Sequence, residues 1–203
     1  MTNATFINNV EIKYAGFCKR LASILIDAAI FAPVMLLRMW LDSISITAGL
    51  IGVVAYCALI TTYDVWFVAK YGQTPGKMAV GIKVVKVDGS PVAWKEALLR
   101  HSINIGFSVV YLIVMFIAIT KISEIDYISL AWNARNAKIY ELFPSWMSWV
   151  NTLSNIWVGS EVVVMLFNKK RRALHDFIAG TIVIHSEKRV AAANGIKMVS
   201  DAT

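Results

Sequence analysis

Residues 21–41 read LASILIDAAIFAPVMLLRMWL, and this stretch decides the fold. A helix that crosses a bilayer needs about 20 mostly apolar residues to span roughly 30 Å of hydrocarbon. Asp27 lies in the middle of the stretch, Pro33 in its second half and Arg38 near its far end. A spanning helix tolerates a proline, and an arginine near its end can extend to the interface. We therefore expect a transmembrane helix over residues 21–41.

Three further stretches have the same apolar character. They cover residues 46–69, 97–120 and 146–167. Residues 121–145, before the last of them, are mixed in polarity and rich in aromatic side chains, which is typical of a helix lying at the membrane–water interface. The sequence predicts an all-α integral membrane protein, a bundle of four transmembrane helices.

The overall composition agrees with a membrane protein. The chain is 58% hydrophobic and only 16% charged, whereas soluble domains are about half apolar and a quarter charged. Its net charge is +7, and the basic residues flank the apolar stretches. We therefore expect anionic lipid headgroups, and not nucleic acid, to be their partners.

The basic residues in the connections predict the orientation, because Lys and Arg are retained in cytoplasmic loops. Three clusters stand out: Lys13, Lys19 and Arg20; Lys70, Lys77, Lys83, Lys86 and Lys95; and Lys169, Lys170, Arg171 and Arg172. Four crossings that begin in the cytoplasm keep all three inside. We expect an uncleaved first span, both termini in the cytoplasm, a bacterial inner membrane, and headgroups bound at the third cluster.

The polar segment over residues 70–96 predicts a small cytoplasmic hairpin between the second and third spans. GQTPGK reads as a turn with Thr74 as a helix N-cap and Pro75 at the first helical position. IKVVKV then alternates before Asp88-Gly89, a hairpin-type pair. We expect one membrane domain over residues 1–186 and a polar, disordered cytoplasmic tail over residues 187–203.

Asp27 is the most informative polar residue. A charged side chain near the centre of a spanning helix costs about 2.5–3.5 kcal/mol, so it should face protein or a water-filled cavity. Arg20 lies seven residues earlier, about two helical turns, on the same face. Two interpretations stay open: a buried Arg20–Asp27 pair that fixes helix packing, or a cation or proton site at Asp27.

Four more polar side chains in the predicted spans are candidates for the same polar core. Asp64 lies near a cytoplasmic end and can reach water. Glu161 is a candidate partner for Arg20 or Arg100. Arg100 and Asn104 share a face, and either Arg100 anchors the interface or both line the polar cavity.

His175 and Asp176 follow the last basic cluster and form a candidate cytoplasmic latch. Asp176 is positioned to be the N-cap of the short segment FIAG, which Gly180 would end. A His–Asp proton relay at the cytoplasmic mouth is the alternative.

Enzyme and cofactor motifs are absent from the sequence. GQTPGK has too few residues between its glycines for a phosphate-binding loop, and Met78 follows its lysine where Ser or Thr is required. There is no GxSxG, no HExxH and no Cys/His ligand array; Cys18 and Cys57 read as small apolar side chains. We expect no catalytic activity, no cofactor and no metal.

Three stretches together resemble the RDD family of small membrane proteins. They are YAGFCKRLASILIDAAIF, YGQTPGKMAVGIKVVKVDGSPVAWKEALLR and KKRRALHDFIAGTIVI. The matching positions are Arg20, Asp27, Gly72, Gln73, Thr74, Gly76, Lys77, Gly81, Asp88, Gly89, Arg100, His175, Asp176, Gly180 and Thr181. Pro75 departs from the family's usual aliphatic residue.

The resemblance implies two kinds of function. Relatives are described as transporters, some of them similar to monovalent cation/proton antiporters, and others as adaptors in larger membrane assemblies. We expect either a transport protein, working at Asp27 as a homo-oligomer or subunit, or a non-catalytic partner of another membrane protein. The chain is short for a transporter, and it lacks the inverted repeat that transporters commonly show.

Overall fold

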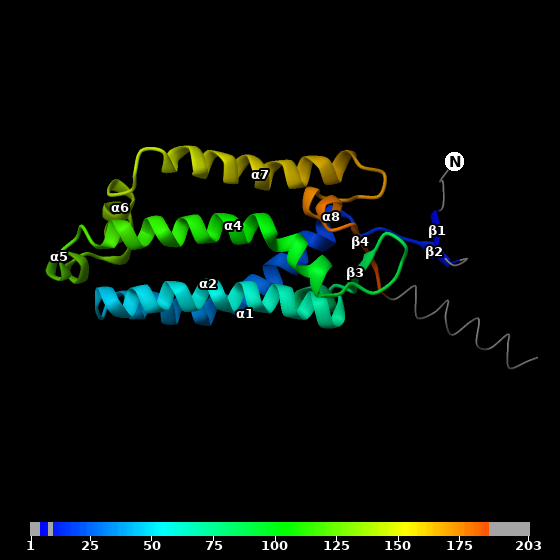
Figure 1. Ribbon diagram of the computed structural model, residues 1–203. Coiled ribbons are helices and arrows are strands. Elements are labelled where there is room, and N and C mark those ends of the chain that lie inside the picture. The colour runs from blue at the N-terminus through cyan, green and yellow to red at the C-terminus, as the bar shows by residue number, and fades with distance from the viewer. Residues whose placement is uncertain (1–4, 8–9, 187–203) are drawn as a thin grey trace, which may run out of the picture. The chain divides into compact units, whose positions relative to one another are not determined.

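Four long helices dominate the computed structural model, which describes residues 5–7 and 10–186. They are α1 (Phe17–Asp42), α2 (Ile46–Tyr71), α4 (Trp94–Ile119) and α7 (Met147–Phe167) (Figure 1). Each is long and apolar enough to cross a membrane. The polar tail expected over residues 187–203 lies outside the described residues.

The helix ends show where hydropathy stops being informative. α1 begins at Phe17 and α4 at Trp94, several residues before the predicted starts at 21 and 97. Hydropathy detects only the part of a helix that lipid surrounds, whereas a helix can continue into polar surroundings. In α4 the extra turn is capped, because the Glu96 carboxylate accepts a hydrogen bond from the Ala93 N–H at 2.9 Å.

The chain divides into two compact units, and every long helix contributes to both. The first unit contains residues 1–28, 64–100 and 159–203, and the second contains residues 29–63 and 101–158. All three basic clusters of the sequence therefore belong to the first unit. The loop between α1 and α2 and the segment between α4 and α7 belong to the second.

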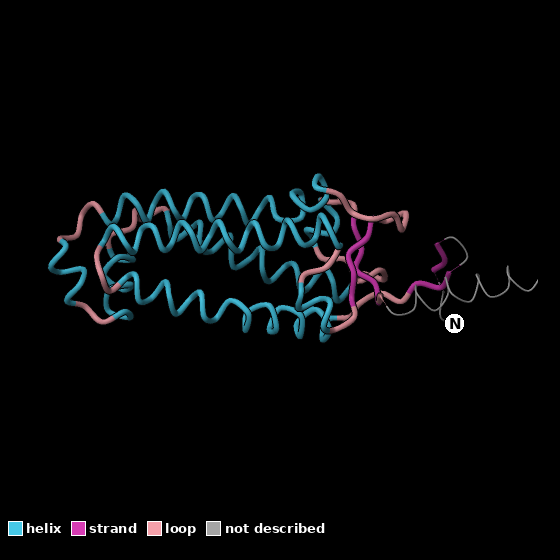
Figure 2. Tube along the Cα trace, turned by 90° about the horizontal axis from the view of Figure 1, so that it is seen from below, coloured by secondary structure: helices cyan, strands magenta, loops and turns pink. Residues whose placement is uncertain are grey.

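A small antiparallel sheet forms the centre of the first unit. β3 (Ile82–Lys86) pairs with β4 (Thr181–His185), so that Val84 lies opposite Val183 (Figure 2). Both of these valines are buried and belong to the unit's core. A second pair, β1 (Thr5–Ile7) and β2 (Val10–Ile12), lies near the N-terminus.

The pairing of β3 corrects the expected local hairpin. A turn does form at Asp88-Gly89, where the Ser90 N–H donates to the Asp88 carboxylate at 2.8 Å and Gly89 has φ +85°. After that turn the chain makes only an isolated bridge between Val85 and Pro91. The strand partner is β4, whose β-branched residues fit a pleated, buried surface.

Two short helices flank this sheet in the first unit. α3 (Pro75–Ala79) follows α2, and α8 (Leu174–Ile178) precedes β4 (Figure 1). Thr74 caps α3 and Pro75 occupies its first turn, which confirms the predicted start of this helix.

The second unit contains the aromatic-rich segment, which forms α5 (Glu124–Ser129) and α6 (Trp132–Glu141). Tyr127 and Ile139 are buried in this unit's core. Arg135 is also buried, and its guanidinium donates to the carbonyls of Tyr127 and Asp42, both at 2.6 Å, and of Leu130 at 2.8 Å. One buried arginine thus joins α5 and α6 to the end of α1.

Candidate functional site

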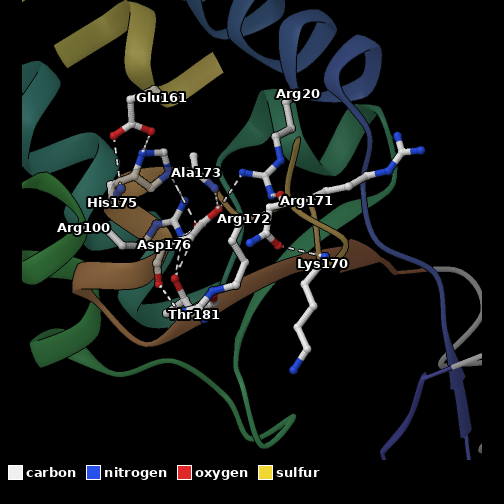
Figure 3. Close-up of polar contacts among 11 residues, drawn as sticks. Arg20, Arg100, Glu161, Lys170, Arg171, Arg172, Ala173, His175, Asp176 and Thr181 are labelled. Carbon is white, nitrogen blue, oxygen red and sulfur yellow. Dashed lines mark hydrogen bonds and ion pairs between the residues drawn. The ribbon is translucent and has the colours of Figure 1, made fainter. Parts of the chain in front are cut away.

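Asp176 is the centre of a buried ionic cluster in the first unit. Its side chain on α8 is 0% exposed. Arg20 of α1 donates to its Oδ2 at 2.8 Å, and Arg100 of α4 donates to its Oδ1 (Figure 3). Arg100 also donates to the Thr181 hydroxyl on β4 at 2.7 Å. One carboxylate therefore connects α8 to two long helices.

Asp176 does not occupy the N-cap position that the sequence predicted. Ala173 is the N-cap, and Asp176 lies three residues later, where its Oδ2 accepts the Ala173 N–H at 3.0 Å. A carboxylate at this position still satisfies a free N–H at the helix start. Gly180, with φ +64°, follows the C-cap as expected.

The charge of Asp176 is stabilised by its neighbours. Burial alone would raise the pKa of this carboxyl, but Arg100, His175 and Arg20 together hold its pKa well below the usual range. Because guanidinium groups stay protonated at any physiological pH, the cluster is permanently ionic. Losing either side of such a pair leaves an uncompensated buried charge.

His175 extends the cluster to α7. Its backbone N–H donates to Glu161 Oε1 at 3.1 Å, and its Nδ1 contacts the same carboxylate. Arg100 Nη2 lies 2.9 Å from His175 Nε2. A guanidinium can only donate, so Nε2 accepts and the ring proton is on Nδ1, facing Glu161. Burial and then Arg100 lower the pKa of His175, against the opposing effects of Glu161 and Asp176.

Of the two interpretations left open at Asp27, the buried Arg20–Asp27 pair does not form, and Glu161, a candidate partner for Arg20 or Arg100, contacts neither arginine. Seven helical residues rise about 10 Å, so side chains on one face can still find closer partners elsewhere. Arg20 pairs with Asp176, and Glu161 contacts His175. Asn104 is exposed on α4, and it does not join Arg100 in this cluster.

Asp27 instead fixes α3 against α1. Its Oδ2 accepts the Thr74 hydroxyl at 2.6 Å, and its Oδ1 accepts the Gly76 N–H at 2.8 Å. Gly76 is buried so tightly that a Cβ there would lie 2.2 Å from the Ser23 carbonyl oxygen and 2.7 Å from the Asp27 carboxyl carbon. Only glycine permits this approach.

Lys77 brings a second charge to the Asp27 cluster. Its Nζ lies 3.3 Å from the Thr74 hydroxyl oxygen, which also donates to Asp27. Burial lowers the pKa of Lys77, the Asp64 carboxylate raises it, and Arg100 lowers it. Asp64 and Asp27 are thus the two acids of the spans that act on this ammonium group.

The family profile of RDD matches residues 14–180, a range that contains both clusters apart from Thr181. The chain belongs to the RDD family. It is an integral membrane protein, and four of its helices are long and apolar enough to cross the membrane. No curated protein and no solved structure matches it.

The last basic cluster of this RDD protein is divided between two roles. Arg172 donates to the Thr181 carbonyl at 3.0 Å and to the Asp176 carbonyl at 2.9 Å, and its guanidinium lies over the Phe177 ring. Its guanidinium is therefore occupied by contacts within the protein, although the sequence analysis expected it to bind lipid headgroups. Lys169, Lys170 and Arg171 are exposed.

Sequence reasoning did not place Thr181, Arg172 or Lys77 in these polar clusters, although Lys77 and Thr181 are among the positions that resemble the family. Each lies outside the predicted spans, where hydropathy carries no information. Over the described ranges 5–7 and 10–186, no group of three or more His, Cys, Asp or Glu side chains is arranged to hold a metal ion.

Proposed function

We propose that this RDD protein exchanges a monovalent cation for protons, alone as an oligomer or as the membrane subunit of a larger exchanger. The observation that supports this most is the Asp27–Thr74–Lys77 chain, with its contacts of 2.6 and 3.3 Å. It joins an acid of a spanning helix to an amine that can release a proton.

The chemistry of the exchange follows from charge balance. In the resting state the Lys77 ammonium serves as the counter-ion of Asp27 and Asp64. A monovalent cation that binds these carboxylates replaces the ammonium, and Lys77 then loses one proton to water. One positive charge enters and one leaves. The lowered pKa of Lys77 favours that release, whereas the arginines around Asp176 cannot deprotonate.

Purified protein in liposomes tests this proposal. With a pH gradient imposed, addition of Na⁺, K⁺ or Li⁺ should dissipate the gradient, as measured by a pH-sensitive dye. Lys77→Arg keeps the positive charge but cannot release a proton, so it should abolish the exchange while leaving folding intact. Lys95→Arg, at an exposed position, is the matched control. Exchange that survives Lys77→Arg, or a wild-type protein that moves none of the three cations, refutes the mechanism.

A non-catalytic adaptor is the second candidate, and the apolar surface of α7 offers it a contact face. Trp149, Leu153, Ile156, Val163 and Phe167 recur at helical spacing and are 53–87% exposed. Such a face packs against lipid or against another membrane helix. Mass measurement after extraction in mild detergent separates the candidates, because a heteromeric complex without flux supports the adaptor.

We also propose that both termini lie in the cytoplasm of a bacterial inner membrane. The three basic clusters belong to one compact unit, which supports retaining them on one side. Single cysteines near Lys83 and Lys170 should react only with cytoplasmic reagent, and one near Asp126 only with external reagent. Labelling of positions 83 and 126 from the same side contradicts four crossings.

A further inference from the structure

A hollow of about 390 Å³ lies in the first unit, between the beginning of α1 and the end of α7. Phe17 lines it from α1, and residues 165–169 together with Arg171 line it from the other side. Its wall changes along the chain from apolar Met165, Leu166 and Phe167 to polar and basic residues. The hollow therefore combines an apolar part with a cationic part at the ends of two spanning helices.

The cationic part is available to a ligand. Lys169 and Arg171 are exposed, whereas Arg20 and Arg172 are bound to groups of the protein itself. The first turn of α1 carries the partial positive charge of a helix N-terminus, which adds to the same attraction. An anionic group would meet three favourable contributions here.

Arg171 is held in a fixed, strained conformation. Its φ of +49° lies in the left-handed region, which a non-glycine residue rarely adopts. Its N–H donates to the Asn168 carbonyl at 2.8 Å, and its own carbonyl accepts from Arg20 at 2.7 Å. The guanidinium lies against Gly16, where a Cβ would be 2.4 Å from Nη1, and it points away from Asp176 (Figure 3).

Such strain persists only where the surrounding structure maintains it, and it is concentrated at functional positions. Here the hydrogen bond from Arg20 connects the Asp176 cluster to the backbone of Arg171. The ionic cluster thus presents one arginine side chain at the rim of the hollow.

We infer that this hollow binds one anionic phospholipid. The phosphate lies between Lys169 and Arg171, and an acyl chain follows Phe17, Leu166 and Phe167 towards the hydrocarbon. Phe167, which is 87% exposed, gains apolar cover in this arrangement. A free inorganic anion would fill only the cationic part, so the apolar wall assigns the site to a lipid.

Native mass spectrometry of the detergent-purified protein tests the inference with phosphatidylglycerol and phosphatidylcholine of identical acyl chains. We expect one phosphatidylglycerol to be retained in preference to phosphatidylcholine. Lys169→Gln and Arg171→Gln should each weaken retention about fivefold, the effect of one basic residue at an anionic surface. Lys170→Gln, exposed but not lining the hollow, should change retention little.

Three outcomes overturn the inference. Equal retention of both lipids would show that the negative charge of the headgroup does not contribute to binding. An equal loss in Lys170→Gln indicates general attraction to the basic cluster and no defined site. Displacement of the lipid by millimolar inorganic phosphate identifies a simple anion site. Thermal unfolding of each variant must match the wild type, so that a folding defect is not counted as lost binding.

Discussion

The two aspartates of the first unit have opposite surroundings. Asp176 is fully buried and ionically paired with Arg20 and Arg100. Asp27 is half-buried and accepts hydrogen bonds from a hydroxyl and a backbone N–H, with Lys77 one hydroxyl away. The first arrangement has permanently charged partners, whereas the second includes a group that can lose its charge.

This difference separates a structural role from the proposed exchange within one unit. A carboxylate paired with two guanidinium groups has no second protonation state at physiological pH, so it can only hold elements together. A carboxylate near a lysine can exchange the ammonium counter-ion for another cation, because the lysine can lose its proton. Asp176 therefore organises α8 and β4 around the long helices, and Asp27 is the position at which chemistry is expected.

The largest expected effect is at Asp176. Asp176→Asn leaves the buried Arg100 and the partly buried Arg20 without their counter-charge, and we expect it to lower the free energy of unfolding by about 3–5 kcal/mol. Thermal unfolding in detergent measures the loss. Asp88→Asn, in an exposed turn, is the control and should stay within about 0.5 kcal/mol of the wild type. Equal melting of both variants would show that the ionic cluster does not stabilise the fold.

The next effect concerns the contact between α3 and α1. Gly76→Ala places a Cβ against the Ser23 carbonyl and Asp27, and overpacking of this kind costs about 1–3 kcal/mol. Gly159→Ala is the matched control, because nothing lies within 4 Å of a Cβ there and alanine favours the helix. If Gly76→Ala unfolds no more easily than Gly159→Ala, α3 is not held against α1.

The sequence was most informative about the spanning helices. Their length and hydropathy are properties of one continuous segment, so each span could be predicted without knowing its neighbours. β4 could not be found in this way. Its residues TIVI look like any short apolar run, and what makes them a strand is β3, about 100 residues earlier in the chain.

The sequence was a better guide to which residues belong to the candidate site than to which residues contact one another there. The sequence singled out Arg20, Asp27 and Arg100 as candidates for a polar core and Asp176 as part of a cytoplasmic latch, and all four have polar partners. It paired Arg20 with the wrong aspartate, because helical periodicity compares only residues of one helix. Asp176 comes from a tail whose position depends on β3 pairing with β4.

A smaller effect is expected at Thr74, whose hydroxyl links Asp27 to Lys77. Thr74→Val keeps the shape but removes the donor to Asp27 and the N-cap acceptor of α3. Loss of such a cap costs about 1 kcal/mol, and exchange through Lys77 should be lost with it. Thr74→Ser retains the hydroxyl and should restore both. Failure of serine to restore flux in a stable protein would mean that the hydroxyl does not connect the two groups.

The smallest expected effect is a pH dependence of the stability of the fold, which arises from His175 in the Asp176 cluster. Its pKa is lowered in the folded protein by burial and by Arg100 on α4, against Glu161 on α7 and Asp176 on α8. The unfolded chain therefore binds the proton more readily. Stability is complete above the ordinary pKa of about 6.5 and is lost as the pH falls below it.

The glutamine variant isolates this effect, because its side-chain amide can still accept from Arg100 but does not titrate. Wild-type protein should melt at a lower temperature at pH 5.5 than at pH 7.5, and His175→Gln should show a smaller difference. The added proton would enter at Nε2, where it faces the Arg100 guanidinium 2.9 Å away, so protonation must disturb that contact. Identical pH dependence in the two proteins would assign the acid sensitivity to carboxylates, and His175 would then contribute only through its position beside Asp176.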